Sequence, residues 1–224
     1  MVTDLALLRL LQLVSPGLPI GMYSYSQGLE KAVEDGWVSN SQQCHNWLLG
    51  LIRQGLTYTD APILARLYQA WVINDQAAVL HWSQYLLACR ETNELRIEDR
   101  QTGQALARLL VNLQIEEAGF WLRHPDASLA NLFSLAAVRW QIGQREALTG
   151  YLWGWLENQL LCAVKLVPLG QVAGQQLLLE LASYLPDCVD KALSLGDAEL
   201  GGSVFGLALA SSRHEMQYSR LFRS

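Results

Sequence analysis

The stretch that most constrains this fold runs from Arg145 to Val167, because it reads as a helix that is apolar on nearly every face. Its apolar side chains include Trp153, Trp155, Leu156, Leu160, Leu161, Ala163, Val164, Leu166 and Val167. A helix that is apolar all round is usually buried inside a larger domain. Polar residues interrupt it too often for a membrane span, which needs roughly 18 or more apolar residues in a row. We therefore predict a buried central helix near residues 145–167.

Glu157, Asn158, Gln159 and Lys165 are the polar residues inside this stretch. A buried polar group is costly unless it is paired. Asn158 and Lys165 are seven residues apart and so lie on nearly one face of a helix. Two interpretations stay open: a satisfied internal network or residues at the rim of the core, on the one hand, and a face that opens on a partner or a polar cavity, on the other. Lys165 precedes Pro168, and a cation suits the end of a helix.

The rest of the chain predicts an all-α fold, a single globular domain over residues 1–224 with about ten helices. No alternating β-branched run of strand length occurs. Asp60 before Ala61-Pro62 predicts a helix start at which Asp60 is the cap. Hydrophobic residues make up 51% of the chain and charged residues 17%, and the charged share is below the usual value of about 25%. We expect a large core or extensive partner surfaces.

The charge pattern and the start of the chain exclude several classes. The net charge is −5, without a basic cluster, which argues against nucleic acid as a partner. Asp4 precedes the first apolar residues and no basic start is present, so we expect neither a signal peptide nor a membrane anchor and place the protein in the cytoplasm. The carboxylates Glu94, Glu98 and Asp99 alternate with arginines, which is typical of a charged helix face.

Motifs for catalysis or cofactor binding are missing. The sequence has no phosphate-binding glycine loop, no nucleophile elbow and no pair of histidines at metal-binding spacing. The scattered cysteines read as buried free thiols. We therefore expect no metal, no cofactor and no enzymatic activity in this chain. The adjacent pair His214-Glu215 leaves one alternative open, a hydrolase that uses both side chains.

Two stretches are typical of recognition. The loop at residues 15–30 combines glycine and proline with Tyr23, Tyr25, Gln27 and Glu30, a composition found in binding loops; alternatively, its tyrosines only pin the loop to the core. The C-terminal segment, residues 211–224, places Arg213 and Arg220 seven apart, on one face if it is helical. We expect Leu221 and Phe222 to be exposed and the segment to become ordered on binding.

These stretches together resemble the family of urease accessory proteins called UreF. The resemblance rests on SPGLPIGMYSYSQGLE at 15–30, TNELR at 92–96 with Gly103-Gln104, AVKLVPLGQ at 163–171 with Gly174-Gln175, and HE at 214–215 with YSRLFRS at 218–224. These four separated motifs occur in this order and are spread over nearly the whole chain. An unrelated helical scaffold is the alternative.

The resemblance implies an all-α, dimeric, non-enzymatic adaptor. Such a protein bridges UreD (UreH in some organisms) and the GTPase UreG, and the assembly delivers nickel to apo-urease; nickel and GTP are handled by the partner complex. A cation from this chain reaching a phosphate of UreG is a further hypothesis. The residues implied in partner binding are Tyr25, Gln27, Glu30, Asp60, Lys165, Gln171, Arg213, His214, Glu215, Tyr218, Arg220, Leu221, Phe222 and Arg223.

The resemblance also assigns roles to some of them. Residues 211–224 would dock on UreD, Lys165 and Asp60 would belong to a surface for UreG, and Tyr25 would support complex formation. If the C-terminal segment becomes ordered only on binding, its removal should leave folding nearly intact and abolish the contact with UreD.

Overall fold

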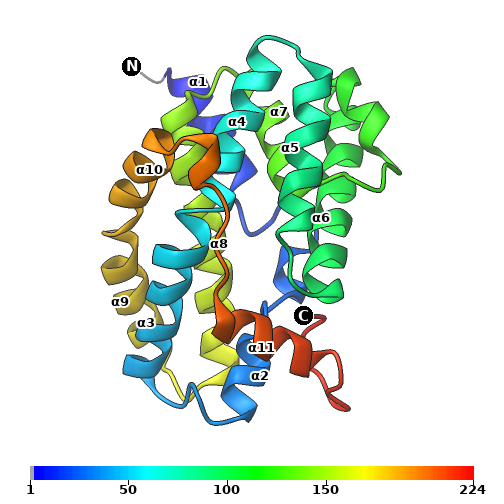
Figure 1. Ribbon diagram of the computed structural model, residues 1–224. Helices are drawn as coiled ribbons and strands as arrows, with labels where there is room; N and C mark the ends of the chain where they lie inside the picture. The colour runs from blue at the N-terminus through cyan, green and yellow to red at the C-terminus, as the bar shows by residue number, and fades with distance from the viewer. Residues whose placement is uncertain (1–2) are drawn as a thin grey trace.

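A computed structural model describes residues 3–224 (Figure 1). In that range the chain forms eleven α-helices and no β-strand. The α-helices are α1 (Asp4–Leu13), α2 (Leu29–Glu34), α3 (Ser41–Gly50), α4 (Asp60–Val72), α5 (Gln76–Ala88), α6 (Asn93–Asn112), α7 (Leu129–Arg139), α8 (Gln144–Leu166), α9 (Gln171–Ala182), α10 (Leu185–Ser194) and α11 (Phe205–His214). Three short 3₁₀ helices are η1 (Met22–Ser24), η3 (Glu116–Trp121) and η4 (Asp197–Glu199), and a π-helix, η2 (Leu51–Leu56), follows α3.

Helix α8 is the central element, as the apolar sequence predicts. It packs against α9, α10, α2, α4, α7, α1 and α3, and Figure 1 shows it running down the middle of the bundle between α3, α9 and α10 on one side and α4 to α7 on the other. Buried residues occur on several of its faces, among them Leu148, Leu152, Leu156 and Ala163. The all-α prediction and the central helix are thereby confirmed.

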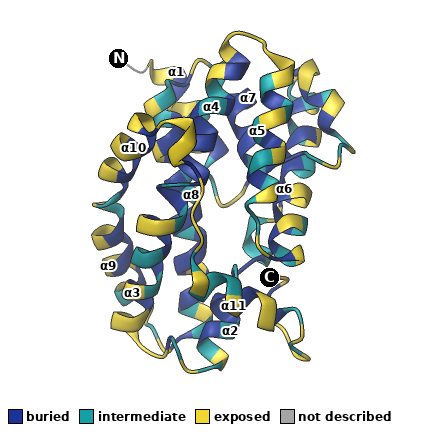
Figure 2. Ribbon diagram, in the orientation of Figure 1, coloured by how far each residue is buried: buried dark blue, intermediate teal, exposed yellow. Residues whose placement is uncertain are grey.

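Glycines allow two of the closest approaches in the bundle. A Cβ on Gly150 of α8 would lie 2.5 Å from Leu10 Cδ1 of α1, and a Cβ on Gly103 of α6 would lie 2.7 Å from the Ala127 carbonyl oxygen. Both distances are too short for any other residue without a shift of the neighbour. Figure 2 shows the result as a buried interior under an exposed outer surface.

The start of α4 differs from the prediction. Thr59 occupies the N-cap position, and Asp60 is the first helical residue. The Asp60 carboxylate points inward to the Arg90 guanidinium, 2.6 Å away, so it serves an ion pair instead of a cap. Within residues 3–224, no helix is long and apolar enough to cross a membrane.

Candidate functional site

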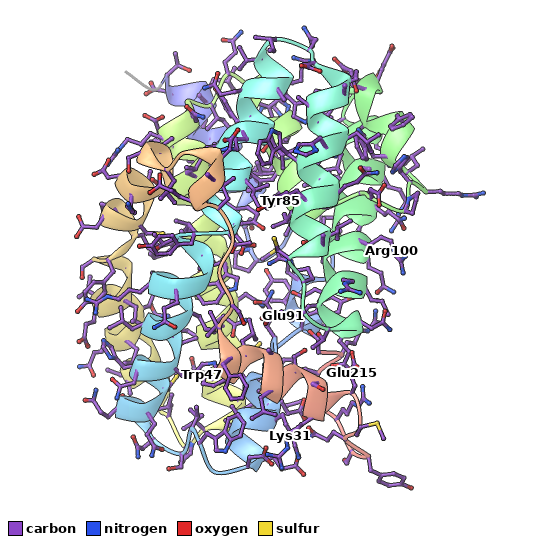
Figure 3. All side chains as sticks on the ribbon, viewed as in Figure 1. Lys31, Trp47, Tyr85, Glu91, Arg100 and Glu215 are labelled. Carbon is purple, nitrogen blue, oxygen red and sulfur yellow. The ribbon has the colours of Figure 1, made fainter. Side chains whose placement is uncertain are left out.

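The sequence motifs converge at one end of the bundle, where α2, α11 and the first turns of α6 meet the last residues of the chain (Figure 1). Helix α2 packs against both α8 and α11. Figure 3 places Lys31 of α2 and Glu215, the residue after α11, at this same end. The first, second and last motifs of the sequence therefore form one structural unit.

The buried carboxylate of Glu30 fixes the chain near its C-terminal end. Glu30 Oε1 accepts a hydrogen bond from the Leu221 amide at 2.7 Å, and Oε2 accepts one from the Phe222 amide at 2.8 Å. Hydrogen bonds to a charged acceptor are stronger than those between neutral groups. These residues have no regular secondary structure. The Glu30 side chain, 9% exposed, therefore accepts the backbone hydrogen bonds that a helix or sheet would otherwise satisfy.

Ser224 is also tied down and has no exposed surface. Its carbonyl oxygen accepts from the Ser26 amide at 2.7 Å and from Ser26 Oγ at 2.6 Å. Its hydroxyl donates to Glu98 Oε2 at 2.9 Å. The Arg223 amide donates to the Ser24 carbonyl at 2.7 Å. We call residues 221–224 the latch, because each of them bonds to the body of the protein.

His214 lies completely buried between two carboxylates. Its Nδ1 is 2.7 Å from Glu94 Oε2, and its Nε2 is 3.5 Å from Glu30 Oε2. Glu215 Oε1 accepts from the Glu94 amide at 3.1 Å, in the first turn of α6. An anion is stabilised at that position by the helix dipole. Both side chains therefore hold α11 on α6, and their geometry argues against the hydrolase hypothesis because no substrate can reach His214.

The C-terminal segment differs from the sequence-based expectation in two respects. It is docked, not free, because the buried carboxylate of Glu30, far away in the sequence, binds its backbone; Phe222 is accordingly 5% exposed. Helix α11 ends at His214, so Arg213 and Arg220 share no helical face. Arg213 pairs with Asp35 at 2.8 Å, and Arg220 pairs with Glu94 at 2.6 Å.

Several apolar side chains of the C-terminal segment nevertheless face solvent. Met216 is 86% exposed, Leu221 is 64% exposed and Tyr218 is fully exposed. Phe205 on α11 is also exposed. Large exposed apolar side chains that cluster on a surface mark interaction sites. Leu221 is thus exposed as expected, whereas Phe222, which we also expected to be exposed, points inward.

The loop at residues 15–30 is pinned to the core by Tyr25, which is 3% exposed. Its hydroxyl donates to Gln101 Oε1 at 2.7 Å, and its carbonyl accepts from Asn158 Nδ2 at 3.1 Å. Burial raises the pKa of Tyr25. Gln27 donates to Glu98 Oε1 and accepts from Trp155 Nε1, both at 2.7 Å. The pinning interpretation is correct for Tyr25, whose ring offers no contact surface.

The polar residues of α8 divide between core and surface. Asn158 is buried and bonded to Tyr25, as an internal network requires. The Gln159 amide is fully buried without a hydrogen-bond partner in the described part of the chain. Lys165 is exposed, with Nζ 5.7 Å from the centre of the Phe222 ring. The third motif therefore reaches the C-terminal segment through a cation–π contact, while Gln171 is exposed at the start of α9.

Behind the loop lies a cavity of about 110 Å³, and charged residues line part of it: Asp60, Arg90, Glu98, Asp99 and Glu157. Arg90 Nη2 is 2.6 Å from Asp60 and 2.9 Å from Asp99. Burial raises the pKa of Glu98 to about 7, against the opposing effect of hydrogen bonds from Gln27 and Ser224. Asp60 is 6% exposed, so it is an interior residue.

Three residues of the site, Glu98, Asp99 and Arg90, are not predicted from the sequence. The alternating charges predict a solvated helix face for the two carboxylates, but both are buried. One signal could have found Asp99, since it lies four residues after Leu95 and four before Gly103, on the packed side of α6. No helical spacing predicts the burial of Arg90, because it lies between α5 and α6. Among residues 3–224, no group of three or more His, Cys, Asp or Glu side chains is placed to hold a metal ion.

Comparison with known proteins identifies the family. The family model for UreF matches residues 38–182. A protein of Alkalilimnicola ehrlichii named urease accessory protein UreF is 55% identical over 220 residues, 98% of this chain and 96% of that protein. The protein of the same name from Pseudomonas putida strain W619 is 51% identical, over 99% of each chain. That of Hahella chejuensis is 47% identical, over 98% of this chain and 99% of its own. The chain belongs to the UreF family of urease accessory proteins.

Proposed function

We propose that this protein is a non-enzymatic adaptor in the cytoplasm that bridges UreD (or UreH) and the GTPase UreG while nickel is inserted into apo-urease. Nickel is the cargo of the assembly, and GTP belongs to UreG. One observation carries the proposal: Met216, Tyr218 and Leu221 project into solvent from a segment whose backbone is fixed by Glu30. A surface of this kind is ready for a partner, because little conformational entropy remains to be lost on binding.

The UreD contact is assigned to this C-terminal surface. An exposed tyrosine beside aliphatic side chains is a common centre of binding energy in protein interfaces. Arg213, Arg220 and Arg223 are exposed around it and supply a polar rim. We assign a supporting role to the buried residues Glu30, His214 and Phe222. They fix the position of the exposed side chains and do not contact UreD.

The UreG contact is assigned to the exposed residues Lys165 and Gln171. Lys165 contacts the ring of Phe222, which belongs to the same segment as the UreD surface, so one end of the molecule can engage both partners. Asp60 contributes indirectly, because its carboxylate holds Arg90 in the interior.

A substitution at the surface tests the UreD contact. We expect Tyr218→Ala combined with Leu221→Ser to weaken binding of an immobilised UreD homologue at least about 30-fold, since one central aromatic residue contributes about 2 kcal/mol or more. Binding is measured by biolayer interferometry. Ile73→Ser is the matched control, because Ile73 is 71% exposed on another part of the surface. Unchanged affinity in the double variant would contradict the assignment.

We also propose that the adaptor is a homodimer and that α1 forms its interface. Leu5, Leu7, Leu8 and Leu11 are between 49% and 62% exposed on this one helix. No charged residue lies among them except Arg9, whose guanidinium stacks on Trp140 at 5.2 Å. A leucine surface of this kind is suited to a second copy of itself, because a two-fold interface brings the same patch together.

Light scattering on a sizing column tests the dimer. We expect the wild-type chain to show twice the mass of the 25.0 kDa protomer and Leu8→Asp to show the mass of one protomer, because a dimer of the variant would bury two unpaired carboxylates, one from each copy, against leucine. Leu179→Ser, at an exposed position on α9, should remain dimeric. A Leu8→Asp protein that still elutes as a dimer would place the interface elsewhere.

A further inference from the structure

The outer face of α6 carries a row of arginines. Arg96, Arg100 and Arg108 recur in steps of four residues, with Gln104 in the one remaining position, and all three arginines are exposed. Residues four apart are neighbours on a helix and lie about 6 Å from one another along its axis. The row is therefore about 18 Å long, and Figure 3 shows Arg100 on the side of α6 that faces away from the bundle.

Folding adds a fourth arginine to this row. Gln104 Nε2 donates to the carbonyl oxygen of His124 at 3.1 Å, so the segment after η3 lies against the middle of α6. Arg123 precedes His124 and is exposed there. No run of basic residues marks this surface in the sequence, because η3 separates Arg123 from α6. The arginine face consists of Arg96, Arg100, Arg108 and Arg123.

The arginine face has no counter-charge within the described protein. Across residues 3–224, none of its four members forms an ion pair, whereas the arginines that do are Arg66, Arg90, Arg139, Arg145, Arg213 and Arg220. Arg96 makes one hydrogen bond, from Nε to the Arg90 carbonyl oxygen at 2.9 Å. The guanidinium groups of the other three donate to no atom of the described chain, so they are free to bind another molecule.

The acidic residues of this region point away from the arginine face. Glu98 and Asp99 of α6 are buried, and Glu94 pairs with Arg220. Glu116 of η3 is exposed but, in the described structure, pairs with no arginine of the face. Folding thus separates charges that alternate in the sequence, and a protein of net charge −5 presents a local positive surface.

We propose that the arginine face docks an acidic surface of a protein partner. Charge complementarity identifies this chemistry, because a planar guanidinium binds a carboxylate through two parallel hydrogen bonds. Complementary charges also steer association and exclude wrong partners. The proposal adds a contact that uses none of the residues assigned to UreD or UreG. This partner lies next to UreD, since Asn93 and Ile97 of α6 line one open pocket with Arg223 of the latch.

Nucleic acid also binds arginines, but the rest of the molecule disfavours it. At physiological ionic strength the screening length is about 8 Å, so a short acidic segment of a protein interacts mainly with the arginine face. A nucleic acid continues beyond a row of about 18 Å. Its further phosphates meet the remaining surface, to which the chain owes its net charge of −5, and are repelled.

Fluorescence anisotropy of a labelled peptide tests the proposal on the full-length chain. The probe is an alanine-based peptide with glutamate at every fourth position, and the same peptide with glutamine at these positions is the neutral control. The face variant combines Arg100→Gln, Arg108→Gln and Arg123→Gln. Arg96 is left unchanged because it bonds to the Arg90 carbonyl oxygen.

A second triple variant controls for net charge. It combines Arg53→Gln, Arg145→Gln and Lys191→Gln, at exposed positions on η2, α8 and α10, and lowers the net charge by the same amount. We expect the wild-type chain to bind the glutamate peptide and not the glutamine peptide. We expect the face variant to bind about tenfold more weakly, because each exposed ion pair contributes modestly and three are lost. The affinity of the control variant should change less than about twofold.

Three results would overturn the proposal. One is a wild-type chain that does not bind the glutamate peptide, and another is an equal loss of affinity in both triple variants. The third is tighter binding of an oligothymidylate of matched charge, because the face would then belong to nucleic acid. Circular dichroism checks that the variants are folded. Should the face variant not fold, Arg100→Gln and Arg108→Gln are measured singly, and unchanged affinity in both overturns the proposal.

Discussion

A chain that ends at Ala210 is expected to lose about 3 kcal/mol of its free energy of unfolding, with a melting temperature lower by about 6–12 °C for a chain of this size. The truncation removes the buried side chains of His214, Phe222 and Ser224. Loss of a buried phenylalanine alone typically costs about 3–5 kcal/mol. The ordering entropy regained by the missing residues offsets part of the total, so we place the net effect at the lower end.

This expectation reverses the one drawn from the sequence, in which residues 211–224 were dispensable for folding. Urea denaturation followed by tryptophan fluorescence gives the free energy of unfolding. Met216→Ala combined with Tyr218→Ala is the matched control, because both side chains point into solvent and surface changes usually stay within about 0.5 kcal/mol. Equal midpoints for the truncated and full-length chains would mean that the docked segment contributes nothing to stability.

The reversal shows which parts of the fold can be read from the sequence. Helix α8 could be predicted almost to its ends, because its apolar pattern is local and persists over 23 residues. The docked C-terminal segment could not. Its anchors are Glu30, Ser26 and Glu98, which lie more than 120 residues away in the sequence, and no local pattern records such a pairing.

The burial of charged residues is the second feature that could not be predicted from the sequence. Glu94, Glu98 and Asp99 look alike in the sequence, yet Glu94 is partly exposed and pairs with both the buried His214 and the exposed Arg220, while the other two are buried. Hydropathy alone assigns all three to solvent. What decides their position is the partner each one finds after folding, and for Asp99 that partner is Arg90.

The contribution of Arg90 and its two buried carboxylate partners to stability can be measured. Arg90→Met is expected to destabilise the protein by about 3–5 kcal/mol, the usual effect of removing one partner from a buried ion pair. The side chains of Asp60 and Asp99 are only 9% and 4% exposed, so two carboxylates would be left close together without a cation. Methionine preserves much of the arginine volume. Arg100→Met is the control, because Arg100 lies on the exposed face of α6 and should change stability by less than about 0.5 kcal/mol.

A second comparison separates charge from packing. If uncompensated charge causes the loss, adding Asp60→Asn and Asp99→Asn to Arg90→Met should restore at least about half of it, because neutral amides tolerate burial better than carboxylates. The amide oxygen of Asn at position 99 can still accept from the Leu129 amide, as Asp99 does at 2.7 Å. Urea midpoints of the single and triple variants decide the question. A triple variant no more stable than Arg90→Met would show that the guanidinium stabilises the interior through its contacts, with its charge a minor part.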